Sequence, residues 1–313
     1  MSALQVGVDI GGTKTHLRAR SGSGRDRDLI LPTSNWRVRD WHRDATVVLS
    51  LACRLAEGDE ITAMAVGAHG CDDASECEAF QSAFAEHAAF PVMVVNDAEL
   101  LPAALGYEHQ IGLVAGTGSI AVCRDREDGM MVAGGWGWAI GDEGSAVGLV
   151  REAGRAVRLH LDGGGTLSEP LVALLLQEFG IANPTRIGSA IAALGGSSEL
   201  GRHAPLVFTA EARGSHLAKQ VIRDGARRLV DLVTQLKKRG SQATMTVAGG
   251  GVIVAQPTLA NAFLEEFAGR FSASMTAVMY PGPPVEGACR LAAALGCGDG
   301  QRAAVGHQPA SDS

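Results

Sequence analysis

Short apolar segments alternate with amphipathic segments along this chain. The apolar segments end in glycine clusters or polar turns, which is typical of buried strands, and the amphipathic ones repeat their apolar positions at helical spacing. Strands that alternate with helices predict an α/β protein. The predicted strands cover residues 4–10, 61–66, 91–95, 111–115, 120–123 and 245–248. The predicted helices cover residues 44–57, 75–88, 97–105, 145–161, 169–178, 215–238, 257–271 and 285–295.

One pattern occurs twice, about 105 residues apart. VGVDIGGTKTHLR begins at Val6 and IGLVAGTGSIAVC begins at Ile111, and each reads as a strand, a glycine–threonine turn and a second strand. Such an echo predicts a duplicated hairpin in two similar domains, each offering one glycine turn to a shared cleft. We expect the domains to cover residues 1–106 and 107–297, with the C-terminal helix 285–296 packing back on the first. We expect a polar loop at residues 21–29 and a disordered tail at residues 298–313.

Composition narrows the class of partner. The chain has 313 residues, with 27 basic and 34 acidic side chains and a net charge of −7, and no basic stripe interleaved with aromatics, which argues against nucleic acid. No run of about 18 apolar residues could cross a membrane, and the amino terminus lacks the features of a secretory signal, so we expect a cytoplasmic protein. The six cysteines form no C-x-x-C pair and are expected to be reduced, mostly buried thiols. No apolar surface face is evident, so a monomer or homodimer is expected.

The first glycine turn follows the first strand. An acid at the strand end precedes two glycines, which let backbone N–H groups approach phosphate oxygens, and then hydroxyls and an ammonium. The pattern is neither G-x-x-x-x-G-K-[ST] nor G-x-G-x-x-G, so it does not support those two nucleotide folds. It predicts a phosphate site, with the acid facing the metal that accompanies the nucleotide. The residues are Asp9, Gly11, Gly12, Thr13, Lys14 and Thr15.

The second glycine turn, Gly116-Thr117-Gly118, matches the G-x-G-x-x-G/A dinucleotide pattern together with the residues that follow it. A dinucleotide site needs a helix to open at the second glycine. Residues 119–123 alternate like a strand instead. A second phosphate hairpin is therefore preferred.

Asn96-Asp97 stands between a predicted strand and a predicted helix. An acid there lies at the carboxyl end of a strand, where open α/β sheets bind ligands. Helix capping is the alternative, and the two residues can share capping and catalysis.

Residues 134–145 are the densest glycine segment. Its tryptophans and close-fitting backbone suit a sugar ring, and Asp142 and Glu143 offer acceptors for hydroxyls, although the same acids could complement the dipole of the next helix. The triple glycine 249–251 would allow close approach of adenine. The loop position of His69 favours an ordinary loop histidine over a catalyst.

In this order the segments resemble the actin-like ATPase superfamily that includes sugar kinases. DIGGTKT, NDAELL, GLVAGTGS, GGWGWAIGDEGS and AGGG are most similar to the N-acetylglucosamine and glucosamine kinase branch, grouped with the BadF/BadG/BcrA/BcrD-type ATPases. The resemblance implies two actin-like (ribonuclease H-like) domains with a nucleotide- and sugar-binding cleft between them.

The resemblance also implies roles for individual residues. Asp97 would be the catalytic base and would also contact the sugar, and Asp9 would face Mg²⁺, through water. ATP and its phosphates would be bound by Gly11, Gly12, Thr13, Lys14, Thr15, Thr117, Gly118, Gly249, Gly250 and Gly251. The sugar would be bound by Asn35, Gly116, Thr117, Gly135, Trp136 and Asp142 as well. The match at Asn35 is approximate because Trp36 follows it directly.

The implied reaction is transfer of the γ-phosphoryl group of ATP to the 6-hydroxyl of an amino sugar, with Mg²⁺ as cofactor. An ammonium at carbon 2 would be attracted by Asp142, Glu143 or Glu99, which favours glucosamine over N-acetylglucosamine. The alternatives are an activator ATPase of the BadF/BcrA type with an iron–sulfur cluster, a kinase of another hexose, and a sugar-responsive regulator. No cysteine is spaced for such a cluster, and no room for a DNA-binding domain precedes residue 4.

Overall fold

The computed structural model describes residues 3–22, 26–125, 129–272 and 274–305, with side chains through residue 297. The chain forms two compact units. Unit 1 contains the residues up to Glu108 and those from Gly282 onward, and unit 2 contains His109–Pro281.

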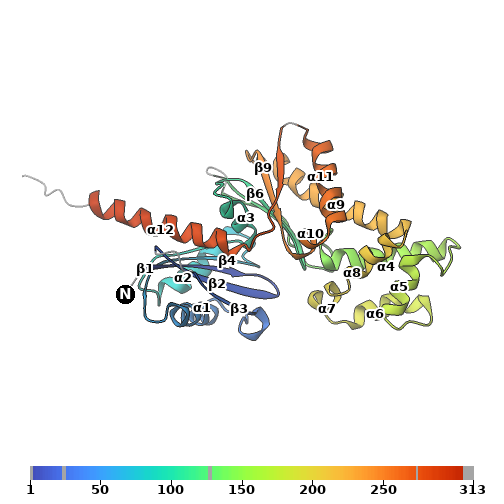
Figure 1. Cartoon of the computed structure of the whole chain (residues 1–313), viewed down its shortest axis with the longest axis horizontal. Helices are drawn as coiled ribbons and strands as arrows, with labels where there is room; N and C mark the ends of the chain where they lie inside the picture. The colour runs from blue at the N-terminus through green and yellow to red at the C-terminus, as the bar shows by residue number, and fades with distance from the viewer. Residues whose placement is uncertain (1–2, 23–25, 126–128, 273, 306–313) are drawn as a thin grey trace, which may run out of the picture. The chain divides into compact units, whose positions relative to one another are not determined.

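Unit 1 is built on a five-stranded sheet in the order β3-β2-β1-β4-β5, with β1 antiparallel to β2 and parallel to β4. Helices α12 and α3 pack on one face of this sheet, and α1 and α2 pack on the other (Figure 1). Its strands are β1 (Ala3–Ile10), β2 (Lys14–Ser21), β3 (Arg27–Pro32), β4 (Glu60–Ala68) and β5 (Val92–Val95). Its helices are η1 (Thr33–Asn35), α1 (Trp41–Ala56), α2 (Ala74–Ala85), η2 (Asp97–Glu99), α3 (Leu100–Ala104) and α12 (Val285–Val305).

The central strand β1 is covered on both faces, which is why it reads as a nearly continuous apolar run. Val6, Val8 and Ile10 are fully buried. Gly7 allows the close approach of α12, because a Cβ atom on Gly7 would lie 2.6 Å from the backbone nitrogen of Cys289. The C-terminal helix therefore belongs to the core of unit 1.

Unit 2 repeats this plan. Its sheet has the order β10-β9-β6-β7-β8, in which β6 is antiparallel to β7 and parallel to β9. Its strands are β6 (Ile111–Ala115), β7 (Ser119–Asp125), β8 (Gly129–Gly134), β9 (Met245–Gly249) and β10 (Thr276–Met279). Its helices are α4 (Ala146–Asp162), α5 (Pro170–Glu178), η3 (Pro184–Arg186), α6 (Ile187–Ala193), α7 (Ser197–Gly201), α8 (Pro205–Ala212), α9 (His216–Lys238), α10 (Gly251–Ala255) and α11 (Pro257–Phe271).

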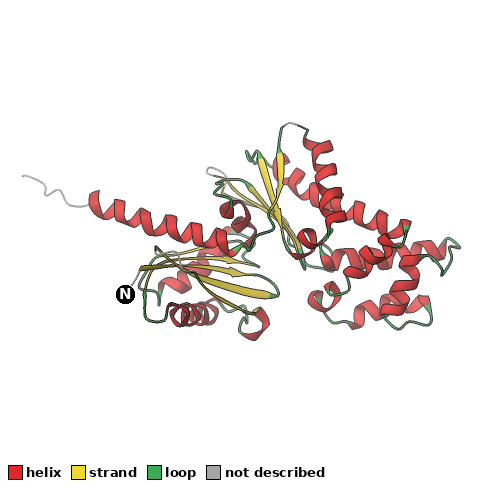
Figure 2. Ribbon diagram, viewed as in Figure 1, coloured by secondary structure: helices red, strands yellow, loops and turns green. Residues whose placement is uncertain are grey.

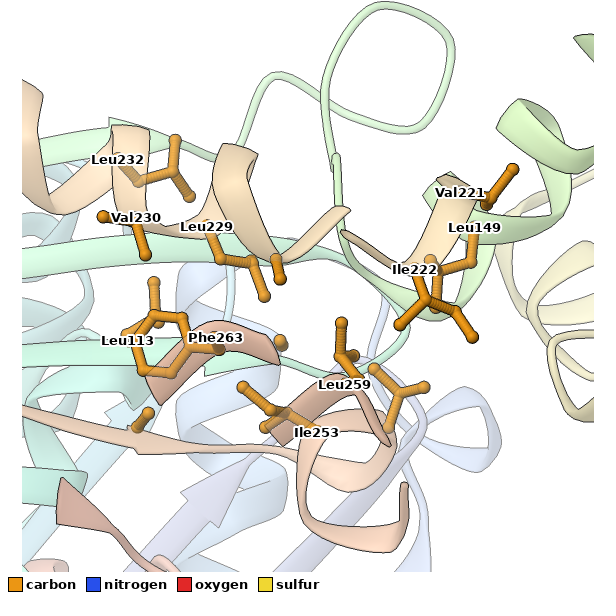
Figure 3. Packing of buried hydrophobic residues seen from close by; sticks show 14 of the residues in the cluster. Leu113, Leu149, Val221, Ile222, Leu229, Val230, Leu232, Ile253, Leu259 and Phe263 are labelled. Atoms are coloured by element: carbon orange, nitrogen blue, oxygen red, sulfur yellow. The ribbon is translucent and has the colours of Figure 1, made fainter. Parts of the chain in front are cut away.

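The core of unit 2 lies between its sheet and the long helix α9. Figure 3 shows Leu229 and Val230 of α9 beside Leu113 of β6 and Phe263 of α11. Helices α4 to α11 are all gathered in the same unit (Figure 2). Read from its opposite edge, the unit 2 sheet has the same connectivity as the unit 1 sheet, so the duplicated hairpin expected from the two glycine turns is present.

Several expectations differ from the structure. The expected domain 107–297 included the segment 282–297, but this segment falls in unit 1 because α12 packs on β1 and β4, in line with the expected packing of the C-terminal helix on the first domain. Helix α12 continues to Val305, so residues 298–305 of the expected disordered tail are helical, and residues 306–313 lie outside the described part of the chain. Part of the expected loop 21–29 forms the start of β3. Strands β3, β8 and β10 and helices α6, α7, α8 and α10 were not predicted.

No helix within the described residues is long and apolar enough to cross a membrane. All six cysteines are free thiols. Cys53 and Cys297 are exposed, and the other four are buried.

Candidate active site

The first glycine turn joins β1 to β2 in unit 1. It is closed by a hydrogen bond from the Gly11 N–H to the Lys14 carbonyl at 3.0 Å, and Gly12, Thr13 and Lys14 are exposed. Exposed backbone and an ammonium at a turn can hold an anion. The turn therefore offers the donors that the sequence predicted.

Thr15 differs from the other predicted phosphate ligands, because it is fully buried. Its Oγ1 lies 2.9 Å from Oγ1 of Thr33, and the indole Nε1 of Trp36 donates to it at 3.1 Å. This hydroxyl anchors the loop after β3 and is not accessible to a phosphate. Asn35, the predicted sugar ligand on that loop, is exposed at the end of η1.

Asp9 lies at the end of β1, just before the turn, and is 6% exposed. Burial and the neighbouring carboxylate of Asp97 raise the pKa of Asp9 to about 7, and the Lys14 ammonium opposes this shift. Two buried carboxylates close together repel each other, so a cation is favoured beside them. Asp9 therefore fits the predicted role of facing Mg²⁺. No group of three or more His, Cys, Asp or Glu side chains in the described ranges could hold a metal by itself.

After β5, the capping of helix η2 falls to Asn96 and Glu99. Asn96 is the cap of η2: its Oδ1 accepts from the Ala98 N–H at 2.9 Å, and the Glu99 carboxylate accepts from the Asn96 N–H at 3.0 Å. The Asn96 side chain also donates to the Cys71 carbonyl at 2.9 Å and to Asp72 at 3.1 Å. Asn96 and Glu99 thus form the capping box, and the carboxyl group of Asp97 is not part of it.

The carboxyl group of Asp97 is 12% exposed, and its Oδ1 is buried with no hydrogen-bond partner among the described residues. Burial raises the pKa of Asp97, and Asp72 adds to this effect, while His69 and Arg37 oppose it. Nδ1 of His69 lies 4.0 Å from Oδ2 of Asp97. A buried carboxyl group with a raised pKa and an unfilled acceptor is suited to take a proton from a substrate.

Arg37 also acts on the Asp97 carboxyl group, and it was not identified from the sequence. Its side chain is 5% exposed, and Nε and Nη2 have no hydrogen-bond partner in the described part of the chain. Asp44 lies 3.8 Å away, but its two oxygens already accept from the Val38 and Arg39 N–H groups. A buried guanidinium near Asp97 stabilises the ionised carboxylate. An arginine in a polar loop gives no sequence signal that it is buried.

The second glycine turn joins β6 to β7 in unit 2. The Gly116 N–H donates to the Gly118 carbonyl at 3.0 Å, and Ser119 begins a strand, which supports the phosphate hairpin over the dinucleotide fold. Asp142 holds this turn: it is 7% exposed, and its Oδ1 accepts from the Ser119 N–H at 3.0 Å. Helix α4 is capped by Ser145 and not by the preceding acids. Asp142 therefore has a structural task at the turn besides any contact with sugar.

The other predicted unit 2 residues gather around the same turn. Gly135 donates its N–H to the Ser119 carbonyl at 3.1 Å, and the next residue, Trp136, is 76% exposed and presents a free aromatic face. A Cβ atom on Gly116 would lie 3.6 Å from the Gly251 nitrogen, and one on Gly250 would lie 2.7 Å from the Ala115 carbonyl carbon and oxygen. The triple glycine and the second turn are thus neighbours. Gly251 opens helix α10.

Known proteins share these motifs and this fold. Residues 6–292 match the BadF/BadG/BcrA/BcrD ATPase family. The chain belongs to the BadF/BadG/BcrA/BcrD ATPase family. This membership confirms the resemblance drawn from the glycine and acidic motifs.

One protein of similar sequence and two solved structures of similar fold can be compared with this chain. Its sequence is 27% identical over 267 residues to N-acetylmuramic acid/N-acetylglucosamine kinase of Clostridium acetobutylicum, covering 78% of this chain and 84% of that protein. Its fold is similar to that of a candidate N-acetylglucosamine kinase of Chromobacterium violaceum, with a TM-score of 0.68, 23% identity and coverage of 92% of this chain and 98% of that one. It is also similar to a ROK family glucokinase of Streptomyces griseus crystallised with glucose and AMPPNP, with a TM-score of 0.58, 17% identity and coverage of 93% and 99%. The predicted fold class is confirmed.

Proposed function

We propose that this chain is an ATP-dependent sugar kinase that transfers the γ-phosphoryl group of ATP to the 6-hydroxyl of an amino sugar. Asp97 carries the proposal. Its carboxyl group is buried, and Oδ1 has no hydrogen-bond partner among the described residues. Asn96 caps the helix in its place, and Asp97 lies near Asp9 at the first glycine turn. The name of the Clostridium acetobutylicum relative supports a sugar as the acceptor.

In the proposed reaction, unit 1 supplies the base and the first phosphate turn. Asp97 accepts the proton of the acceptor hydroxyl as its oxygen attacks the γ-phosphorus, and the bond to the leaving ADP oxygen breaks. General-base assistance of this kind contributes about 10² to 10⁴ in rate. Gly11, Gly12, Thr13 and Lys14 bind the phosphates, and Asp9 would hold Mg²⁺ through water. Mg²⁺ supplies charge neutralisation for the phosphates when it is bound.

Unit 2 supplies binding groups in this proposal. Gly116, Thr117 and Gly118 meet phosphate and sugar, and Gly249, Gly250 and Gly251 receive the adenosine. Gly135, Trp136 and Asp142 are the unit 2 residues proposed to contact the sugar. In unit 1 the proposed sugar contacts are Asn35 and Asp97.

Among amino sugars we now favour N-acetylglucosamine. The expectation of glucosamine depended on acids free to attract an ammonium, yet Asp142 accepts from Ser119 and Glu99 accepts from Asn96. Only Glu143 of those three is without a backbone donor among the described residues. The relative's name also includes an N-acetylated sugar.

A substrate panel tests the proposal. Purified protein is incubated with ATP and glucosamine, N-acetylglucosamine, N-acetylmuramic acid or glucose, with and without Mg²⁺, and ADP is measured by a coupled assay. We expect sugar-dependent ADP release with N-acetylglucosamine that requires Mg²⁺. Release with glucosamine alone would reverse the preference, and no sugar-dependent release with any acceptor would overturn the kinase assignment.

A further inference from the structure

His69 lies where the first glycine turn and Asp97 come together within unit 1. It is the residue after β4, and its N–H donates to the Ile10 carbonyl at 2.8 Å. Ile10 is the last residue of β1 before the turn. The backbone of His69 is therefore fixed to the strand that carries the turn.

The two edges of the imidazole face different groups. A Cβ atom on Gly12 would lie 3.5 Å from Nε2 and from Cδ2 of His69, so Nε2 borders the exposed backbone of the turn. On the other edge, Nδ1 lies 4.0 Å from Oδ2 of Asp97. The ring thus bridges the predicted phosphate site and the predicted base.

The ring also remains available to a ligand. The His69 side chain is 43% exposed, and neither nitrogen has a hydrogen-bond partner among the described residues. Because Gly12 has no side chain, nothing from the turn covers Nε2. A histidine whose main task was packing or local hydrogen bonding would be more enclosed or would have a partner.

We propose that His69 is a further catalytic residue, whose Nε2–H donates a hydrogen bond to an oxygen of the γ-phosphoryl group during transfer. This inference rests on the proposed function. The acceptor oxygen forms a bond to the γ-phosphorus, the bond to the β–γ bridging oxygen breaks, and ADP leaves with that electron pair. The hydroxyl proton goes to Asp97, and the proton on Nε2 stays on the imidazole. Fixed donors aimed at developing charge lower the barrier more than they strengthen ground-state binding.

Three variants test this role. For His69→Ala we expect kcat to fall about 10²-fold, the loss typical of removing one such donor. The KM for sugar should change less than about threefold, because the contact strengthens in the transition state. His69→Gln keeps an N–H donor of similar reach and should recover about tenfold of the loss. The exposed His87→Ala in the same unit is the control and should match the wild-type protein.

Added imidazole provides a readout that a structural role would not give. The cavity left by His69→Ala is open to solvent, so free imidazole should restore part of kcat in this variant and none in Asp97→Asn. Thermal unfolding of each variant is measured in parallel.

The outcomes separate this inference from the kinase assignment. Wild-type kcat in His69→Ala would overturn the inference alone, as would equal losses in the Ala and Gln variants with a lowered unfolding temperature and no rescue by imidazole. A wild-type protein that forms no ADP with any sugar defeats the proposed function, and the inference with it.

Discussion

The two glycine turns occupy the same place in two sheets of the same connectivity, yet their surroundings differ. Each turn closes with one backbone hydrogen bond of 3.0 Å, from Gly11 to Lys14 in unit 1 and from Gly116 to Gly118 in unit 2. The unit 1 turn has two buried carboxyl groups with raised pKa values beside it, those of Asp9 and Asp97. The carboxylate at the unit 2 turn, Asp142, accepts a backbone hydrogen bond.

The different carboxyl groups beside the two glycine turns indicate different roles for the turns. A carboxylate oxygen that accepts the backbone N–H of a turn stabilises that turn, whereas a buried oxygen without a partner, such as Oδ1 of Asp97, can react with a ligand. Under the proposed function, the hairpin positions ligands in unit 2 and carries the chemistry in unit 1. The predictions below address this division.

Asp97→Asn should give the largest effect. The amide cannot accept the hydroxyl proton, so we expect kcat to fall about 10³-fold. Asp73→Asn is a matched control: Asp73 is an exposed acid that caps α2 through the Glu76 N–H, and asparagine caps equally well. Normal turnover by Asp97→Asn in the coupled assay would remove Asp97 from the mechanism.

Alanine should affect stability at the unit 2 turn and ATP binding at the unit 1 turn. A Cβ atom on Gly118 would lie 2.8 Å from Oδ1 of Asp142, so Gly118→Ala should lower the free energy of unfolding by about 1–3 kcal/mol. The nearest atoms to a Cβ on Gly12 are at 3.5 Å, so Gly12→Ala should fold normally. Its methyl group would obstruct the approach of phosphate, and we expect the KM for ATP to rise roughly tenfold. Denaturant unfolding and steady-state kinetics measure both effects, and equal behaviour of the two variants would contradict the comparison.

Asp9→Asn should change stability by an amount that depends on pH. The folded-state pKa of Asp9 is raised from 3.8 to about 7, so in the absence of Mg²⁺ the carboxyl group stabilises the folded state below about pH 4 and loses this contribution as pH rises towards 7. The Asn variant should therefore become more stable relative to wild type by at most about 1.4 kcal/mol per pH unit within this window. Unfolding in EDTA at several pH values measures the difference. A difference in the free energy of unfolding between the two proteins that stays constant with pH would contradict a raised pKa for Asp9.

The sequence predicted the repeated hairpins because glycines and alternating apolar residues report directly on local conformation. Strand β3 was missed because it is an edge strand with alternating exposure, and Arg27 and Asp28 made its start look like a loop. It is stabilised from outside its own segment, since Asp28 accepts from Arg18 at 2.8 Å and bonds His16 at 2.6 Å. Such cross-strand pairs are invisible to local patterns.

The candidate site was predictable where a residue's task follows from its place next to a strand end. Asp97 and Gly12 are of this kind. The burial of Thr15 and Arg37 depends on how the loop after β3 folds over β2, which no local pattern encodes. The capping role of Glu99 could be recognised only from the backbone geometry of η2.

The division between the units is tested most directly by measuring turnover and the calorimetric affinity for sugar in Asp97→Asn and Asp142→Ala, at a temperature where both are folded. The account predicts that Asp97→Asn binds sugar as the wild type does and fails to turn over. It predicts that Asp142→Ala binds sugar at least about tenfold more weakly and still turns over at saturation. The reverse pattern, with affinity lost at Asp97 and turnover lost at Asp142, would contradict it.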